Sequence, residues 1–316
     1  MTKRVAAIDC GTNSLRLLIA DVDPAAQRLT DVKRRMEIVR LGQGVDATGR
    51  LAPEALARTM RVLDDYAAEI HSALAKTVRM VATSATRDAS NASEFTDGVL
   101  ATIGVTPEVI SGSEEARLSF NGATTELAAE GGGPLPPYLV VDIGGGSTEF
   151  VLGSDANAAD LAGISVDIGC VRLTERHLHS DPPTEAEVTA AIADIDHALV
   201  DVAGAIDATH ARTLVGLAGS VTTVTAIALG LPVYDPGKTH HARITAASVH
   251  AVTQQLLSQT HAQRAAIGSL HPGRIDVIGA GALVLDRVMQ RFEFGDVVTS
   301  EHDILDGIAW SVAAHD

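Results

Sequence analysis

The sequence predicts an α/β protein made of two similar domains, each built on a mixed β-sheet. Two observations support this class. Hairpins alternate with helical segments, and the order hairpin, strand, helix, strand, polar turn, helix occurs twice within the 316 residues. Hairpins combined with alternating helices give mixed sheets rather than fully parallel ones. Duplication of a unit this large indicates two similar domains that face each other across a cleft.

The first half opens with a predicted hairpin, whose strands Val5–Asp9 and Leu15–Asp21 flank the turn Cys10–Asn13. Glycine and asparagine tolerate the left-handed backbone that such turns use. Apolar residues then recur at steps of three and four from Leu56 to Leu74, which predicts a helix. The other predicted elements are a strand at Glu37–Leu41, a strand at Val78–Ala82, the polar turn Thr83–Arg87 followed by a helix, a strand near Glu108–Ile110 and a helix from about Ser113.

The second half repeats this order after Glu130–Pro137, a stretch that breaks every pattern and is predicted to be an exposed connection. The predicted first domain is 1–124 together with a C-terminal helix, 302–316, and the second domain is 125–301. The predicted elements of the second half are strands Tyr138–Asp142, Glu149–Leu152, Gly163–Ile168, Leu214–Ala218 and Asp296–Ser300, and helices Glu185–Ile206, Thr245–Thr260, Ile275–Phe292 and one from Ile304.

The charge, the cysteine content and the length of the apolar stretches limit which binding partners we expect. The formal charge is -16, whereas broad nucleic-acid binding needs basic faces, so we expect no nucleic-acid partner. A phosphate site must therefore be local, built from backbone N–H groups, a few arginines and a divalent metal. Cys10 and Cys170 make no disulfide framework, which favours the reducing cytoplasm. No apolar stretch is long enough to span a membrane, so no membrane partner is expected.

The two hairpin turns are the strongest functional signal. Each follows an apolar strand that ends in aspartate, and glycines there let the backbone approach a phosphate with its N–H groups. A single such turn is more simply an ordinary hairpin, but two at matching places favour phosphate binding. Gly219 and Ser220 open a helix after a strand and join the predicted phosphate-binding set. The two turns contribute Asp9, Gly11, Thr12, Asn13 and Ser14, and Asp142, Gly144, Gly145, Gly146, Ser147 and Thr148.

Longer stretches narrow the interpretation to a family. Residues 7–14, 82–91, 110–117 and 142–149 together resemble the exopolyphosphatase/guanosine pentaphosphate phosphatase (Ppx/GppA) family, and 169–175 and 218–223 match its later motifs. The resemblance covers nearly the whole chain and is closest to the short, two-domain actinobacterial members. It implies duplicated actin-like ATPase (RNase H-like) domains. The segment Ser300–Gly307 departs from the family pattern because it lacks an arginine, which predicts a change in the cleft or in the substrate chain that it accepts.

Glu115 is the catalytic residue that the resemblance implies. The residues alone favour a structural interpretation, because Ser111 and Glu114 have the spacing of a helix capping box. That box gives Glu114 a role and leaves Glu115 without one. In the family, the matching glutamate is the proposed base that activates water. The first turn of a helix would favour its ionised form.

The resemblance also implies a metal site, and the residues themselves offer arginines, each of which could bind phosphate or form a surface ion pair. Asp142 and Glu149 would hold Mg²⁺ or Mn²⁺, since two carboxylates beside a phosphate chain suit such a cation. Arg87 follows a strand end and could clamp phosphate with two hydrogen bonds, and Arg16 is a further candidate. A helical glutamate–arginine pair explains Arg117 more simply.

Three functions stay open at this point. The first is release of terminal orthophosphate from inorganic polyphosphate or guanosine pentaphosphate by metal-assisted attack of water. The alternatives are an ATP-dependent kinase or ATPase of the same superfold, and a non-catalytic sensor of polyphosphate or an alarmone. The choice between the two substrates and the oligomeric state, a homodimer included, also stay open. His240 and His241 are predicted to be solvated and to point in different directions.

Overall fold

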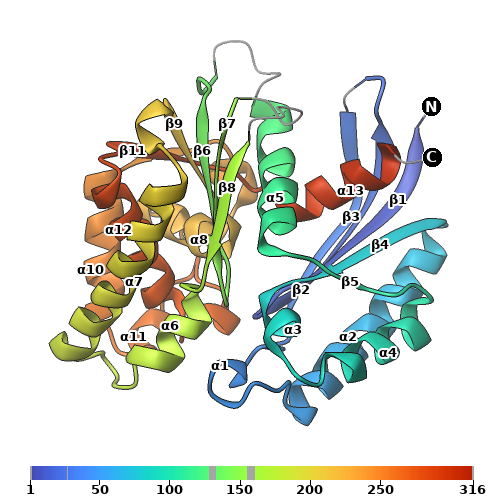
Figure 1. Ribbon diagram of the computed structural model, residues 1–316, viewed down its shortest axis with the longest axis horizontal. Helices are drawn as coiled ribbons and strands as arrows, with labels where there is room; N and C mark the ends of the chain where they lie inside the picture. The colour runs from blue at the N-terminus through green and yellow to red at the C-terminus, as the bar shows by residue number, and fades with distance from the viewer. Residues whose placement is uncertain (1, 27, 128–132, 155–160, 315–316) are drawn as a thin grey trace. The chain divides into compact units, whose positions relative to one another are not determined.

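The computed structural model describes residues 2–26, 28–127, 133–154 and 161–314 (Figure 1). The chain divides into two compact units, Met1–Thr125 with Asp303–Asp316, and Glu126–His302. Each unit has its own sheet and its own hydrophobic core. The connection predicted at Glu130–Pro137 falls partly on 128–132, which lie outside the described residues.

The sheet of the first unit combines antiparallel and parallel neighbours. β1 pairs antiparallel with β2 and parallel with β4, and β2 pairs antiparallel with β3. Within the described residues it has five strands in the order β3-β2-β1-β4-β5. The strands are β1 (Lys3–Cys10), β2 (Ser14–Asp23), β3 (Arg28–Ile38), β4 (Thr77–Ala82) and β5 (Glu108–Val109).

Helices cover both faces of this sheet. On one face, α2 and α4 bury Leu63, Tyr66 and Phe95 against alternate residues of β1 and β2. On the other face, α13 buries Ile304 and Ile308 (Figure 1). Successive side chains of a strand point to opposite faces of the sheet, so the same strand contributes residues to the hydrophobic core on each face. The helices are α1 (Val45–Thr48), α2 (Pro53–Ser72), α3 (Ser84–Asp88), α4 (Ala92–Ile103), α5 (Gly112–Leu127) and α13 (Ile304–Ala314).

Two glycines set the contact between α5 and α13. A Cβ atom added to Gly122 would lie 1.8 Å from the carbonyl oxygen of Asp303, and one added to Gly307 would lie 2.0 Å from the carbonyl oxygen of Leu118. Both obstacles are backbone atoms, which cannot move aside as a flexible side chain can. Glycine at both positions therefore allows the two helix backbones to touch.

The sheet of the second unit repeats the plan of the first. β6 pairs antiparallel with β7 and parallel with β9, and β7 pairs antiparallel with β8. In the described residues the order is β10-β11-β9-β6-β7-β8, so β8-β7-β6-β9 reproduces β3-β2-β1-β4. This confirms the predicted duplication and the mixed sheets. The strands are β6 (Tyr138–Ile143), β7 (Thr148–Gly153), β8 (Ala162–Val166), β9 (Thr213–Leu217), β10 (Arg243–Thr245) and β11 (Asp296–Thr299).

The helices of the second unit share one core with its sheet. Leu139 and Val141 of β6 pack in one cluster with Leu199 of α7 and Leu283 of α12. Thr184 and Glu187 form a complete capping box that fixes the start of α7. The helices are α6 (Cys170–His177), α7 (Glu185–Ala205), α8 (Ala218–Ala228), α9 (Pro236–Thr239), α10 (Ala246–Ser258), α11 (His261–Ala265) and α12 (Ile278–Arg291), with short 3₁₀ turns at Ala208–His210 and Pro272–Arg274.

Two local predictions in the first unit were wrong. The strand expected at Glu37–Leu41 is β3, Arg28–Ile38, an edge strand whose middle is charged and exposed. The segment is a strand because it pairs with β2, and its own sequence has no apolar pattern that would indicate a strand. The segment predicted as the polar turn Thr83–Arg87 forms most of the helix α3, which at five residues is too short to show helical periodicity.

The prediction for His240 and His241 was also wrong. Their rings stack with centroids 3.7 Å apart, and the ring of His302 lies 4.7 Å from that of His240. His241 has a φ of 58°, in the left-handed region, so the chain turns sharply between the two residues. This turn brings adjacent side chains onto the same side.

Both cysteines are buried, and burial raises the pKa of the Cys10 and Cys170 thiols. A neutral, buried thiol reacts slowly with thiol reagents. We expect the native protein to resist labelling by dithiobis-nitrobenzoate and to react at both of its 2 cysteines in denaturant. Rapid labelling of the native protein at pH 8 would contradict the packing around both residues.

Among the described residues, no helix is both long enough and apolar enough to cross a bilayer.

Candidate active site

The first hairpin turn follows Asp9, the aspartate near the end of β1. Arg16 faces Asp9 across the two strands and donates to its Oδ2 atom, from Nε at 2.9 Å and from Nη2 at 2.6 Å. Asp9 is 3% exposed, and its Oδ1 atom has no hydrogen-bond partner among the described residues. Burial raises the pKa of Asp9, while the charge of Arg16 opposes that effect. The turn thus holds a buried carboxylate with one oxygen available as an acceptor.

The backbone of this turn is fixed through its carbonyl oxygens. The Thr12 carbonyl accepts from the N–H of Gly42 at 2.8 Å, and the Asn13 carbonyl accepts from the N–H of Val39 at 3.0 Å. The hydroxyls of Thr12 and Ser84 are 2.9 Å apart. Within the part of the chain that the structure describes, the N–H groups of Thr12 and Asn13 have no acceptor. Such unused N–H groups suit an anion.

The second hairpin turn has the same internal hydrogen bond. The N–H of Gly144 donates to the carbonyl of Ser147 at 3.0 Å, just as the N–H of Gly11 donates to the carbonyl of Ser14 at 3.0 Å. Thr148 was predicted to bind phosphate. Its hydroxyl instead donates to the backbone carbonyl of Ile168 at 2.9 Å. That hydroxyl therefore fixes the turn.

The start of α6 packs directly on this second turn. The N–H of Cys170 donates to the Gly144 carbonyl at 2.9 Å, and the N–H of Gly169 donates to the Gly146 carbonyl at 3.2 Å. A Cβ at Gly169 would lie 2.2 Å from the Gly145 carbonyl oxygen, so the close approach requires glycine. The N–H groups of Gly145 and Gly146 have no acceptor among the described residues. This turn also presents amides to an anion.

Asp142 and Glu149 lie opposite each other in the register of β6 and β7. They are 6% and 1% exposed, and the Ser165 hydroxyl donates to Glu149 Oε1 at 2.7 Å. Within the described ranges, no group of three or more His, Cys, Asp or Glu side chains could hold a metal ion. Two carboxylates fit Mg²⁺, which takes its other ligands from water and phosphate.

Arg274, a residue that the sequence did not reveal, comes from the 3₁₀ turn Pro272–Arg274 and lies against the start of α8. Ala218, the first residue of α8, has a φ of 65°, a strained value outside glycine. Arg274 covers the next residue so closely that a Cβ at Gly219 would lie 2.2 Å from the guanidinium carbon. Ser220 packs in the same way against Gly281, which explains the glycine there as helix packing. No spacing or periodicity marks Arg274, since only the tertiary fold brings it to α8.

Glu115 lies in the first turn of α5 and is 8% exposed. Arg87 of α3 lies beside it, with Nη1 at 3.3 Å from Glu115 Oε2 and at 2.9 Å from the Ile110 carbonyl, to which it donates. The capping box is half formed, because the Ser111 hydroxyl accepts from the N–H of Glu114 at 3.2 Å. The Glu114 carboxylate turns instead to arginine.

The expected helical pair explains Arg117. Its Nη2 lies 3.2 Å from Glu114 Oε2, one helical turn away, and Arg79 holds the other oxygen of Glu114 at 3.2 Å. Arg117 is well exposed, as befits a surface ion pair. This pairing gives Arg117 no place in the site.

Each unit gathers its candidates at one edge of its sheet. β1, β4 and β5 run parallel, so the first turn, Arg87 and Glu115 all follow the carboxyl ends of neighbouring strands. In the second unit β6 and β9 run parallel, and their carboxyl ends bear the second turn and Gly219. Ligands of α/β sheets bind at this edge.

Comparisons with known proteins agree with this arrangement. The model of the Ppx/GppA phosphatase family matches residues 18–315. The chain is 51% identical to Exopolyphosphatase 2 of Mycobacterium tuberculosis over 98% of both chains. It is 29% identical to guanosine-5'-triphosphate,3'-diphosphate pyrophosphatase of Aeromonas salmonicida, covering 97% of this chain and 59% of that one.

A solved structure shares the fold. The crystal structure of the Ppx/GppA family member of Aquifex aeolicus superposes with a TM-score of 0.81 at 30% identity, over 100% of both chains. A family match across almost the whole chain and a matching structure agree with the duplicated mixed sheets. The chain belongs to the Ppx/GppA phosphatase family.

Proposed function

We propose that this protein releases terminal orthophosphate from inorganic polyphosphate, and from guanosine pentaphosphate, by attack of water in the cytoplasm. The observation that carries the proposal is the pair of equivalent hairpin turns whose inner N–H groups have no acceptor among the described residues. The names of the Mycobacterium and Aeromonas relatives support these two substrates. Two buried thiols suit a reducing compartment.

The roles follow from the chemistry of each group. The amides of the turns, with Gly219 and Ser220, would bind phosphate oxygens, and Arg274 would add a cation next to them. Asp142 and Glu149 would hold Mg²⁺ or Mn²⁺, which supplies positive charge against the phosphate chain. Glu115 would accept the proton of the attacking water, with Arg87 fixing its carboxylate.

The decisive experiment compares phosphate release from polyphosphate, guanosine pentaphosphate and ATP, with and without Mg²⁺. We expect Mg²⁺-dependent release of orthophosphate from polyphosphate and guanosine pentaphosphate, because Glu115 provides a base for water. Phosphorylation of a small acceptor by ATP would instead identify a kinase. Tight binding of polyphosphate without release in the presence of Mg²⁺ would identify a sensor.

A further inference from the structure

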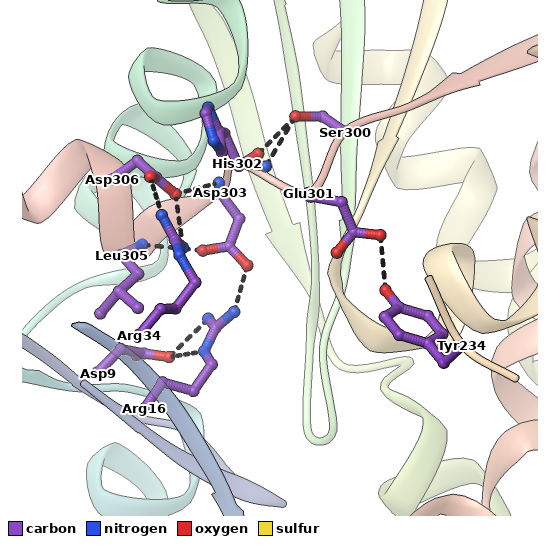
Figure 2. A network of polar contacts seen from close by, with 10 residues as sticks. All are labelled: Asp9, Arg16, Arg34, Tyr234, Ser300, Glu301, His302, Asp303, Leu305 and Asp306. Atoms are coloured by element: carbon purple, nitrogen blue, oxygen red, sulfur yellow. Dashed lines mark hydrogen bonds and ion pairs between the residues drawn. The ribbon is translucent and has the colours of Figure 1, made fainter. Parts of the chain in front are cut away.

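Arg16 shares its guanidinium between two buried carboxylates (Figure 2). Nε and Nη2 donate to Asp9 Oδ2, and Nη1 donates to Asp303 Oδ2. Asp303 is 5% exposed, and the Arg16 side chain is only 18% exposed. Asp303 comes from the segment that departs from the family pattern and was not among the predicted site residues.

A helix cap is the simpler explanation of Asp303. It precedes α13, and its Oδ1 atom accepts from the N–H of Leu305 at 3.0 Å. Asp306 completes a reciprocal cap, because its Oδ2 accepts from the N–H of Asp303 at 3.0 Å and its carboxylate is paired with Arg34 (Figure 2). A cap needs one oxygen, and serine or asparagine serves as well as aspartate. Capping therefore accounts for Oδ1 of Asp303 and leaves its charge and Oδ2 unexplained.

The negative charge that Asp303 brings with its Oδ2 atom has an electrostatic cost, which the capping hydrogen bond does not offset. Asp303 and Asp9 are like charges on one cation, and both carboxylates are buried away from water, which costs free energy. In return, Arg16 is held from two sides, so its planar fork cannot rotate away from Asp9. Two hydrogen bonds to Oδ2 then fix the Asp9 carboxylate, including Oδ1, the buried atom that lacks a partner among the described residues.

We propose that Asp303 is a positioning residue, which holds Arg16 so that Asp9 Oδ1 can accept a hydrogen bond from a water of the hydrated divalent cation that accompanies the phosphate chain. This inference rests on the proposed function, because it gives Oδ1 its acceptor role in that reaction. The role resembles that of outer-shell groups, which orient the groups that contact a cation.

Asp303→Ser tests the proposal, because serine keeps the cap of α13 and cannot reach Arg16. We expect kcat/KM for polyphosphate to fall roughly 10- to 100-fold, the usual effect of outer-shell substitutions. Binding of Mn²⁺ with imidotriphosphate, measured by calorimetry, should weaken while the melting temperature stays unchanged. Asp303→Asn, which can cap through its carbonyl oxygen and lacks the charge, provides the same measurements if the serine variant folds poorly.

The matched control is Asp21→Asn. Arg4 and Asp21 form a second arginine–aspartate pair across β1 and β2, at 2.8 Å, and their side chains are 40% and 32% exposed. This variant should bind and hydrolyse as the unaltered protein does. A loss equal to that of Asp303→Ser would overturn the proposal, because it would reflect general loosening of the hairpin.

A double variant separates positioning from a purely structural role. If Asp303 acts through Asp9, Asp303→Ser should have no further effect in an Asp9→Asn background. An equal loss in both backgrounds would overturn the inference. If the unaltered protein binds Mn²⁺ and imidotriphosphate but releases no phosphate, the proposed hydrolysis fails, and the binding cycle still decides the role of Asp303.

Discussion

Replacing Glu115 by glutamine is expected to lower turnover by roughly 10²- to 10⁴-fold, the usual contribution of a general base. Glutamine has almost the same shape and can still accept from Arg87, which lies 3.3 Å from the carboxylate. It cannot take a proton from water. Phosphate release from polyphosphate in a stopped assay measures the loss, and calorimetry with the same substrate should show an almost unchanged dissociation constant.

Glu114→Gln is the control for this variant. Glu114 is the neighbour of Glu115 in α5, and its carboxylate pairs with Arg79 and Arg117. We expect nearly normal turnover, because a partly exposed pair contributes little. Nearly normal turnover of Glu115→Gln would refute the assignment of the base. Equal losses in the two variants would indicate damage to the start of α5 instead.

Gly122→Ala and Gly307→Ala should each lower the free energy of unfolding of the first unit by about 3 kcal/mol, the upper range for overpacking. Their added Cβ atoms would lie 1.8 Å from the carbonyl oxygen of Asp303, just before α13, and 2.0 Å from that of Leu118 in α5. Neither oxygen can move without shifting α13 away from α5. The protein has 1 tryptophan, Trp310, which lies in α13 and packs against the core that this helix covers. Urea unfolding followed by its fluorescence therefore reports the affected helix.

Gly204→Ala provides the matched control. Gly204 is a helical glycine of α7, and a Cβ there would meet nothing within 4 Å. Alanine should leave stability unchanged or raise it by up to about 1 kcal/mol through helix propensity. If Gly122→Ala and Gly307→Ala unfold at the same urea concentration as this control, the α5–α13 contact is looser than the structure indicates.

The sequence predicted the parts of the fold that local chemistry determines. Both hairpins were recognised because aspartate, glycine and hydroxyl residues follow an apolar strand, and the duplication followed from seeing that pattern twice. β3 was misplaced since an exposed edge strand carries charged residues and its identity comes from pairing with β2. The short helix α3 gave no periodic signal.

The sequence predicted only those site residues that belong to a local motif of neighbouring residues. Glu115 came from resemblance, and the structure adds that Arg87 reaches it from another helix. Arg274 and Asp303 were missed for a common reason. Each meets its partner, Gly219 or Arg16, across a long stretch of sequence, and no local pattern encodes such a meeting.

The place of α13 in the first unit has a consequence for synthesis. The chain leaves this unit at Thr125 and returns at Asp303, so the ribosome makes all of the second unit before the helix that covers one face of the first sheet. Domains usually fold in the order in which they emerge. Here Val5, Ala7 and Leu18 stay without the helix that covers them until α13 has been made. The apolar face of the first sheet is therefore exposed for most of the time that the chain is being synthesised.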